Sequence, residues 1–208
     1  TMVACSAPAS GAGTVAVTVS FNGQRTDAGQ PMMFAYLATS AVLIQPTRGG
    51  QKGGTMVTVS GPGVSRDVED IGCAFGKERV RAQYHEPHGW VCASPSRAGP
   101  GVVDFSVLRG AVPISLGEER FFEFLLNPQV SGLQPSIGWV EGGTTVTVRG
   151  SGFTEQGVQC RFGAGDLVPG MPPRWISSTA LACVAPASGV GSGAVGVEVS
   201  VNDGADFT

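Results

Sequence analysis

Residues 45–61 read QPTRGGQKGGTMVTVSG, and this phrase returns about 89 residues later as QPSIGWVEGGTTVTVRG at residues 134–150. In both copies a Gly-Gly-Thr turn leads into valines at alternate positions. Alternation of this kind is the pattern of a β-strand with one buried face. A second phrase follows each copy, CAFG at 73–76 and CRFG at 160–163. Recurrence at a fixed period predicts tandem copies of one structural unit.

A third phrase, Cys-x-x-Pro, is followed each time by a glycine-rich turn and an alternating apolar run. Its three copies lie at residues 5–8, 92–95 and 183–186. We therefore predict the back part of one repeat at 1–38, a complete repeat at 39–127 and most of a third at 128–208, with the completeness of its last strand left open. Because the first copy lies so close to residue 1, we expect the chain to open inside a repeat and to be a fragment of a longer protein.

The composition favours an all-β fold. The 32 glycines and 14 prolines interrupt helices, while a hydrophobic content of 42% is too high for a disordered linker. Turn signals every 8–12 residues or so, within units of roughly 85–90 residues, are typical of two stacked antiparallel sheets, as in an immunoglobulin-like sandwich. Gly117–Leu126 has the length for a short helix, but its apolar cluster favours a last strand.

The charge pattern argues against nucleic acid as a partner. Charged residues make up 14% of the chain, the formal net charge is −3, and the cationic residues are scattered. Binding to phosphates requires a basic face that displaces counterions. The sequence also lacks an apolar run near the roughly 18 residues of a membrane span. We expect no nucleic-acid partner and no membrane contact from this segment.

The five cysteines follow the repeat. The middle repeat has Cys73 and Cys92, and the last repeat has Cys160 and Cys183 at matching places. This recurrence predicts one disulfide per repeat and an oxidising compartment, so we expect an extracellular or cell-surface location. Cys5 corresponds to the second cysteine of a pair, and we expect it to be unpaired here because its partner lies upstream of residue 1.

A zinc site is an alternative use of these cysteines. Two thiols and two imidazoles lie close in sequence: Cys73, His85, His88 and Cys92. The set is nominally a Cys₂His₂ site. However, the segment from Cys160 to Cys183 has both cysteines and no histidine. The cysteines of that repeat serve without such a site, so we predict no metal ligand here.

Calcium, phosphate and catalysis have weaker support. Acidic residues cluster in one loop and at one place in the other repeat: Asp67, Glu69, Asp70 and Glu155. Calcium loops need four or more oxygen donors at fixed spacing. The glycine-rich run 49–55 lacks the Gly-Lys-Ser/Thr order that binds phosphate. His85 and His88 have no evident serine or acidic partner. We predict no catalytic residue and no cofactor, and we expect the chain not to be an enzyme.

The three tryptophans have two interpretations. Trp90, Trp139 and Trp175 do not occupy matching positions in the repeats. An exposed tryptophan stacks well on a sugar or on a partner surface. Packing at the boundary between repeats is the interpretation that we favour.

The last repeat resembles a known family. The residues that carry the resemblance are Pro135, Gly138, Gly142-Gly143-Thr144, Val146-Thr147-Val148, Gly150, Gly152-Phe153, Cys160, Phe162-Gly163, Leu181, Cys183 and Pro186. This string resembles the IPT/TIG domain, an immunoglobulin-like fold found in plexins, scatter-factor receptors and fibrocystin-like proteins. The middle repeat departs from it at Gly61-Pro62-Gly63-Val64, where we expect a different turn. The resemblance implies the cysteine pair of receptor-type repeats but not the DNA binding of some intracellular members.

The resemblance also implies a function as a spacer and protein-contact module. Short links at Leu37–Ser40 and Leu126–Gln129 favour a stiff rod. We expect a structural or adhesive segment that contacts other extracellular or cell-surface proteins or assembles with itself. The alternative is a carbohydrate-binding module with glycan ligands, or an accessory region of a larger extracellular enzyme. Tryptophans exposed together on one flat face would favour that alternative.

Overall fold

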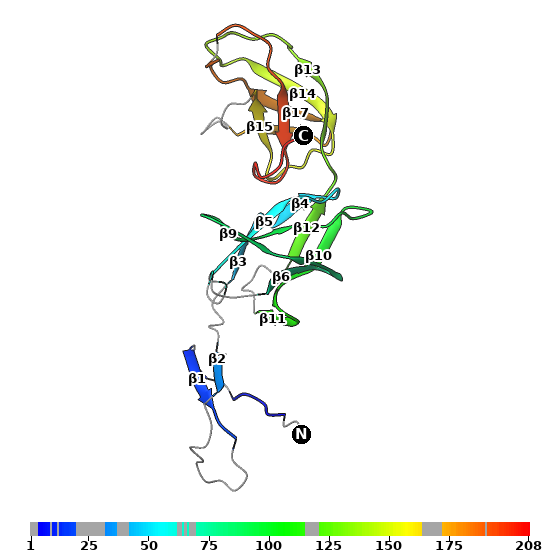
Figure 1. Cartoon of the computed structure of the whole chain (residues 1–208). Coiled ribbons are helices and arrows are strands. Elements are labelled where there is room, and N and C mark those ends of the chain that lie inside the picture. Colours follow the sequence, from blue (N-terminus) through cyan, green and yellow to red (C-terminus); the bar gives the residue numbers. More distant parts are fainter. Residues whose placement is uncertain are drawn as a thin grey trace.

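The computed structural model describes residues 4–8, 10–11, 13–19, 32–36, 42–61, 64, 66, 70–114, 121–163, 172–189 and 191–208. All regular structure in these residues is β-strand. Near the N-terminus, β1 (Gly13–Val17) pairs antiparallel with β2 (Met32–Tyr36). The remaining strands form two units, which we call the middle sandwich (residues 42–125) and the last sandwich (residues 129–208), and these follow one another along the chain (Figure 1).

The middle sandwich has two sheets. The first has the order β3 (Leu43–Gln45), β5 (Met56–Ser60), β9 (Gly89–Ala93) and β8 (Gln83–His85). The second has the order β4 (Arg48–Gly50), β12 (Phe121–Leu125), β10 (Gly101–Arg109), β6 (Ile71–Phe75) and β7 (Glu78–Arg81), and β11 (Val112–Ile114) also pairs with β10. Strand β12 runs antiparallel to β10 and parallel to β4. It therefore lies between β10, which precedes it closely in sequence, and β4, which comes much earlier in the chain.

Alternating side chains from both sheets fill the core of the middle sandwich. On β5, Val57 and Val59 are buried between exposed or half-buried neighbours. Opposite them lies a cluster of four buried aromatic side chains from the second sheet: Phe75, Phe105, Phe122 and Phe124. The Phe75 ring makes edge-to-face contacts with Phe105 and Phe122, each at 4.9 Å between centroids. Burial of such rings is the main source of stability for a small sandwich.

The last sandwich has a matching first sheet and a smaller second sheet. The first has the order β13 (Gln129–Gln134), β14 (Thr145–Ser151), β17 (Ala180–Val184) and β16 (Arg174–Ser177). The second, in the described part of the chain, consists of β15 (Gln159–Phe162) and β18 (Val197–Ser200). Its core is aliphatic for the most part, with Val148, Leu181 and Val199 fully buried.

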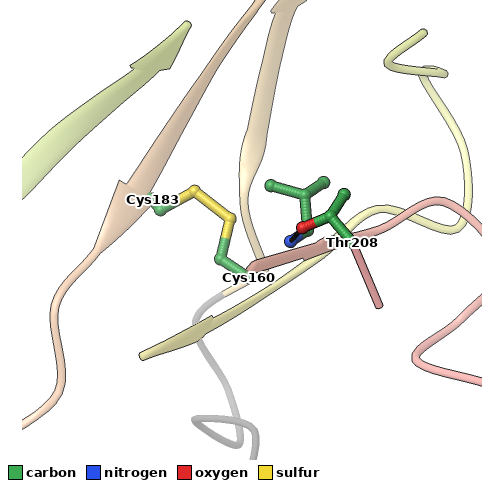
Figure 2. The surroundings of a disulfide bond; sticks show 4 residues. Cys160, Cys183 and Thr208 are labelled. Atoms are coloured by element: carbon green, nitrogen blue, oxygen red, sulfur yellow. Dashed lines mark hydrogen bonds between the residues drawn. A yellow bond between two sulfur atoms is a disulfide. The ribbon is translucent and has the colours of Figure 1, made fainter. Parts of the chain in front are cut away.

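One disulfide joins the two sheets in each sandwich. Cys73 of β6 is bonded to Cys92 of β9, and Cys160 of β15 is bonded to Cys183 of β17, with Cα atoms 6.2 and 6.3 Å apart. Figure 2 shows the second bridge with Thr208 beside it. Cys5 is a free, exposed cysteine. Because the two bridges close loops of similar length, each is expected to contribute about 3 kcal/mol.

The all-β, immunoglobulin-like fold predicted from the sequence is confirmed. Within Gly117–Leu126 the strand interpretation holds for β12, while residues 117–120 lie outside the described residues. The same is true of the link Leu37–Ser40 and of Pro62 and Gly63. The division into 1–38, 39–127 and 128–208 stays a prediction.

Candidate functional site

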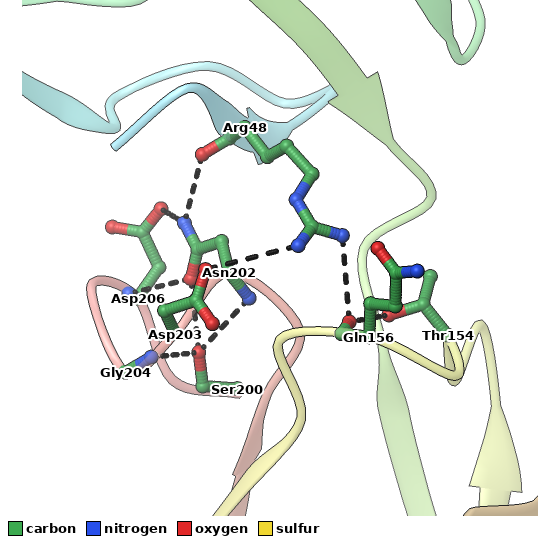
Figure 3. Close-up of polar contacts among 8 residues, drawn as sticks. All are labelled: Arg48, Thr154, Gln156, Ser200, Asn202, Asp203, Gly204 and Asp206. Carbon is green, nitrogen blue, oxygen red and sulfur yellow. Dashed lines mark hydrogen bonds and ion pairs between the residues drawn. The ribbon is translucent and has the colours of Figure 1, made fainter. Parts of the chain in front are cut away.

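The two sandwiches meet at a polar cluster that we call the seam. It comprises Arg48, Thr55, Gln156, Asn202, Asp203 and Asp206, and Figure 3 shows all of these except Thr55. Arg48 begins β4, and Thr55 directly precedes β5 in the middle sandwich. Asn202 to Asp206 follow β18 in the last sandwich. The seam therefore brings together residues more than 100 positions apart in the chain.

Hydrogen bonds within the last sandwich shape its side of the seam. The Oγ of Ser200, fully buried, accepts from the backbone N–H of Gly204 at 3.0 Å. Asn202, 2% exposed, uses Oδ1 to accept from the backbone N–H of Asp206 at 3.0 Å and donates from Nδ2 to the Asp206 carboxylate at 2.8 Å. Buried polar groups that are fully paired give a segment one defined conformation. The loop thus presents its carboxylate in a fixed place.

Two hydrogen bonds join this loop to the middle sandwich. The hydroxyl of Thr55, a residue 1% exposed, donates to Oδ2 of Asp206 at 2.6 Å. Asn202 Nδ2 also donates to the backbone carbonyl of Arg48 at 3.2 Å. A bond to a carboxylate is stronger than one between neutral groups. Loss of the first bond would leave the buried hydroxyl of Thr55 without its partner, which costs more than the bond itself contributes.

The Arg48 side chain adds weaker contacts to the seam. Its Nη1 donates to the carbonyl of Gln156 at 3.4 Å, and its Nη2 lies 3.8 Å from Oδ2 of Asp203. The Asp203 side chain is 66% exposed, so this ion pair is screened and contributes little. The Arg48 side chain itself is largely buried, at 20% exposure. Packing of its aliphatic part is therefore a larger contribution than its charge.

The link between the sandwiches is held from both sides. Leu125, the last residue of β12, is buried in the core of the last sandwich. Asn127 accepts from the backbone N–H of Lys52 through Oδ1 at 3.0 Å. A Cβ on Gly50 would lie 2.6 Å from Nδ2 of Asn127, and a Cβ on Gly152 would lie 3.2 Å from its carbonyl. The link is therefore packed tightly between two glycines, and larger residues there would displace it.

The structure separates the residues of the nominal zinc set. Cys73 and Cys92 are joined to each other, while His85 and His88 are exposed at β8 and the turn after it. Asp70 and Glu155 are exposed, and Asp67 and Glu69 lie outside the described residues. A search of the described residues finds no group of three or more His, Cys, Asp or Glu side chains placed to hold a metal ion. The same residues contain no helix with the length and apolar character to cross a membrane.

The tryptophans lie in three different settings. Trp90 packs against the core of the middle sandwich and makes an edge-to-face contact with Tyr84. Trp175 donates from Nε1 to the carbonyl of Phe153. Trp139 is 79% exposed in this chain. Since Trp90 packs inward, the three do not form one exposed flat face.

Sequence reasoning missed the seam because its residues depart from the repeat. Arg48 stands where the other repeat has Ile137, and the run Asn202–Asp206 follows the last recognisable repeat phrase. Asn, Asp and Gly together indicate a turn, but not what the turn contacts. The change from Ile137 to Arg48 is visible in the sequence, but it does not identify the partner.

Comparisons with known proteins place this geometry in a family. The model of the IPT/TIG domain matches residues 42–121 and 128–208. Mouse Plexin-B2 is 26% identical over 149 residues, which cover 68% of this chain and 8% of the relative. Human Fibrocystin-L is 32% identical over 119 residues, which cover 54% of this chain and 3% of the relative.

Among solved structures, the chain is similar to the plexin A4 full extracellular region. That match has 18% identity and a TM-score of 0.47, and it covers 83% of this chain and 15% of the other. The chain thus spans a small part of each of these proteins. The disulfide-bonded sandwiches and the plexin relatives agree with the location expected from the cysteines, and the protein is extracellular or on the cell surface. With two copies of the domain over most of its length, the chain belongs to the IPT/TIG domain family.

Proposed function

We propose that this chain is a non-enzymatic spacer that holds its domains in a fixed orientation and contacts other extracellular or cell-surface proteins. The observation that carries the proposal is the seam. A chain of flexibly joined domains does not need a buried asparagine and a preformed loop at the joint. Here both are present, together with a link packed between Gly50 and Gly152.

Magnitudes support a stiff joint. Each hydrogen bond across the seam contributes about 1 kcal/mol net, and the bond to the Asp206 carboxylate contributes more. Burial of Leu125 in the neighbouring core adds roughly 2 kcal/mol. A joint opposed by several kcal/mol is open in fewer than about 1% of molecules at 25 °C, since 1.4 kcal/mol changes an equilibrium tenfold.

The proposal includes the organisation of the chain into 1–38, 39–127 and 128–208, with the seam between the second and third parts. It also includes a mechanical or adhesive role, in which position is transmitted from one domain to the next. Repeats of this kind couple mainly to their nearest neighbours. Stiffness at each seam would therefore set the stiffness of the whole array.

Residual dipolar couplings of the isotope-labelled chain test the proposal. If the joint is stiff, one alignment tensor fits the backbone couplings of both sandwiches. The double variant Asn202→Ala/Asp206→Ala removes the side-chain bonds between these two residues and both hydrogen bonds from the loop to the middle sandwich, and we expect two tensors of different magnitude. Asp104→Ala, which removes an exposed carboxylate on β10, is the matched control and should keep one tensor.

Two results would contradict the proposal. If the wild-type chain already requires two different tensors, its joint is flexible, and the seam does not hold the domains in a fixed orientation. A double variant that keeps one tensor while its disulfide-bonded cores remain folded shows that the seam does not set the orientation. Far-UV circular dichroism of each variant separates loss of orientation from loss of fold.

A further inference from the structure

The second sheet of the middle sandwich has an outer face, turned away from the core, on strands that lie side by side (Figure 1). Successive side chains of a strand point to opposite sides of a sheet, so those that alternate with the core residues point outward. Val102 and Asp104 of β10 share this face with Glu123 and Phe121 of β12, which lie opposite them in the register. Val102 is 59% exposed and Phe121 is 56% exposed, with the last sandwich in place. Two large apolar side chains are thus diagonal neighbours in contact with solvent.

Charges of opposite sign lie on opposite sides of this face. The acidic side is formed by Asp104 of β10 and Glu123 of β12. The basic side is formed by Arg79 and Arg81, both exposed, on β7 at the far edge of the sheet. Within the part of the chain that the structure describes, none of these four residues belongs to an ion pair. Together with the two exposed apolar side chains, they form what we call the bipolar face.

Small residues separate the two sides of the bipolar face. Ala74 of β6 lies between Ser106 of β10 and Arg79 of β7, in register with both. Neighbouring strands are about 4.8 Å apart, so β7 and β10 are separated by roughly 10 Å. Asp104 lies two positions further along β10 than Ser106. Arg79 and Asp104 are therefore too far apart to neutralise each other within one chain.

The last sandwich has the opposite arrangement at the corresponding positions. Arg161 of β15 and Glu198 of β18 stand where the middle sandwich has Ala74 and Ser106. Nε of Arg161 lies 2.8 Å from Oε2 of Glu198, so these charges neutralise each other inside the sandwich. In the middle sandwich the centre is small and uncharged, and the charges on either side of it remain available to a partner.

We propose that the bipolar face binds the bipolar face of a second copy of the chain, an inference that rests on the proposed role of the chain as a contact module. A two-fold axis in the plane between two such faces places the acidic side of each copy over the basic side of the other, so every contact occurs twice. Val102 then packs on the small residues of β6, and Phe121 packs on the aliphatic parts of the arginines. A partner with charges of one sign would be repelled by one side of the face.

The size of the face sets the strength of this association. Five strands at about 4.8 Å spacing, and about six residues along β10, give a face of roughly 20 Å by 20 Å. Such an area is at the lower end of specific interfaces, so we expect a weak dimer. Its charged contacts lie near solvent and are screened by salt. The dimer should therefore form at high chain concentration and weaken as the salt concentration rises.

Sedimentation velocity of the full chain, from about 10 µM to about 1 mM, is the test. All chains carry Cys5→Ser, because the exposed free thiol of Cys5 would allow two copies to be linked by a disulfide. We expect a reversible monomer–dimer equilibrium. The dissociation constant should rise at least about threefold between roughly 0.05 M and 0.5 M sodium chloride.

Two charge reversals on opposite sides of the face provide the specific variants, Arg79→Glu/Arg81→Glu and Asp104→Arg. Each reversal affects its contact twice in the dimer, so each should raise the dissociation constant at least about tenfold. An equimolar mixture of the two variants should associate again, because the first has an entirely acidic face and the second a mainly basic one. All three positions are exposed, so the variants are expected to fold, which circular dichroism checks.

The matched control is Arg149→Glu/Arg174→Glu. Both arginines are exposed on the first sheet of the last sandwich, and the control changes the net charge by the same amount as Arg79→Glu/Arg81→Glu. It should associate like the Cys5→Ser chain. Equal weakening in the two double variants would mean that net charge governs association, and it would overturn the proposal.

Three other results would also overturn the proposal. The chain would stay monomeric up to about 1 mM, or the mixture of the two reversed variants would fail to associate. Alternatively, a monomeric chain would bind a heparin oligosaccharide and lose that binding in Arg79→Glu/Arg81→Glu, which would make an anionic glycan the occupant. These failures are distinct from failure of the stiff spacer, because Asp104 lies away from the seam and Asp104→Arg should keep one alignment tensor for both sandwiches.

Discussion

The middle and last sandwiches have the same first sheet and different second sheets. Strands β3, β5, β9 and β8 have counterparts in β13, β14, β17 and β16, in the same order. The second sheet of the middle sandwich gains β12 from about 70 residues after β4, and that strand brings Phe122 and Phe124. The described second sheet of the last sandwich has two strands, and the place of β12 in this repeat would come after residue 208. A local phrase thus specifies one sheet, while closure of the other depends on a distant strand.

The two sandwiches are therefore stabilised by different interactions. The middle core is built around four contacting phenylalanines, and the last core is built from valines and Leu181 around one disulfide. The last sandwich also receives Leu125 from its neighbour. For the chain of residues 1–208, we therefore expect the middle sandwich to be the more stable of the two and the last sandwich to depend more on its bridge and on the seam.

Phe122→Ala should have the largest effect. Phe122 is fully buried and contacts Phe75, Phe105 and Phe124, so its truncation leaves a cavity in the aromatic cluster. We expect a loss of about 3–5 kcal/mol from the middle sandwich, measured by urea unfolding with tryptophan fluorescence. Phe121→Ala, at a position 56% exposed, is the control and should cost less than about 1 kcal/mol. Equal effects of the two variants would show that β12 does not cover the core.

Removal of the disulfides should have the next largest effect and should be similar in the two sandwiches. The bridges close loops with sequence separations of 19 and 23, which differ little in chain entropy. Cys73→Ala/Cys92→Ala and Cys160→Ala/Cys183→Ala are each expected to cost about 3 kcal/mol. Because the last sandwich starts from lower stability, the same loss should unfold it at a lower urea concentration. If the middle sandwich unfolds first after removal of its bridge, the ranking of the two cores is wrong.

Local features of this structure can be predicted from the sequence, whereas contacts between distant residues cannot. The period of the phrases at Gly53-Gly54-Thr55 and Gly142-Gly143-Thr144 predicts the repeat, and the alternating valines predict the strands that carry it. Cysteines at matching positions indicate the number of bridges. Each of these signals is local, or it is repeated within one chain.

The seam is beyond such signals. The bond from Thr55 to Asp206 joins residues 151 positions apart, and Thr144, the counterpart of Thr55, accepts from the Trp139 N–H within its own sandwich. One sequence phrase therefore has two environments, set by what lies next to it in space.

The Thr55→Val and Thr144→Val pair tests whether the shared phrase has these two roles. Thr55→Val removes the donor to Asp206 from a buried position, and we expect a loss of about 1–2 kcal/mol, shared by both sandwiches because the bond crosses the seam. Thr144→Val removes an acceptor 3.3 Å from the Trp139 N–H at an exposed turn and should cost less than about 0.5 kcal/mol. Amide hydrogen exchange reports the unfolding free energy of each sandwich separately and so measures the loss in each variant. Equal losses of stability in the two variants would mean that the hydrogen bond from Thr55 across the seam does not contribute to stability.

The smallest effect is expected from His85→Ala/His88→Ala. Both histidines are exposed, and the pairing of His85 with Gly89 is through the backbone, which alanine preserves. The double variant should change the stability of the middle sandwich by less than about 0.5 kcal/mol. The last sandwich provides an internal reference, since it has an equivalent disulfide and no histidine between its cysteines.

With Cys73 bonded to Cys92, two exposed imidazoles alone would be a poor zinc site, so calorimetric titration of the oxidised chain with zinc should show no tight binding. Submicromolar zinc affinity that disappears in the double variant would reveal a zinc site on this loop. The two sandwiches would then differ in metal binding as well as in core packing.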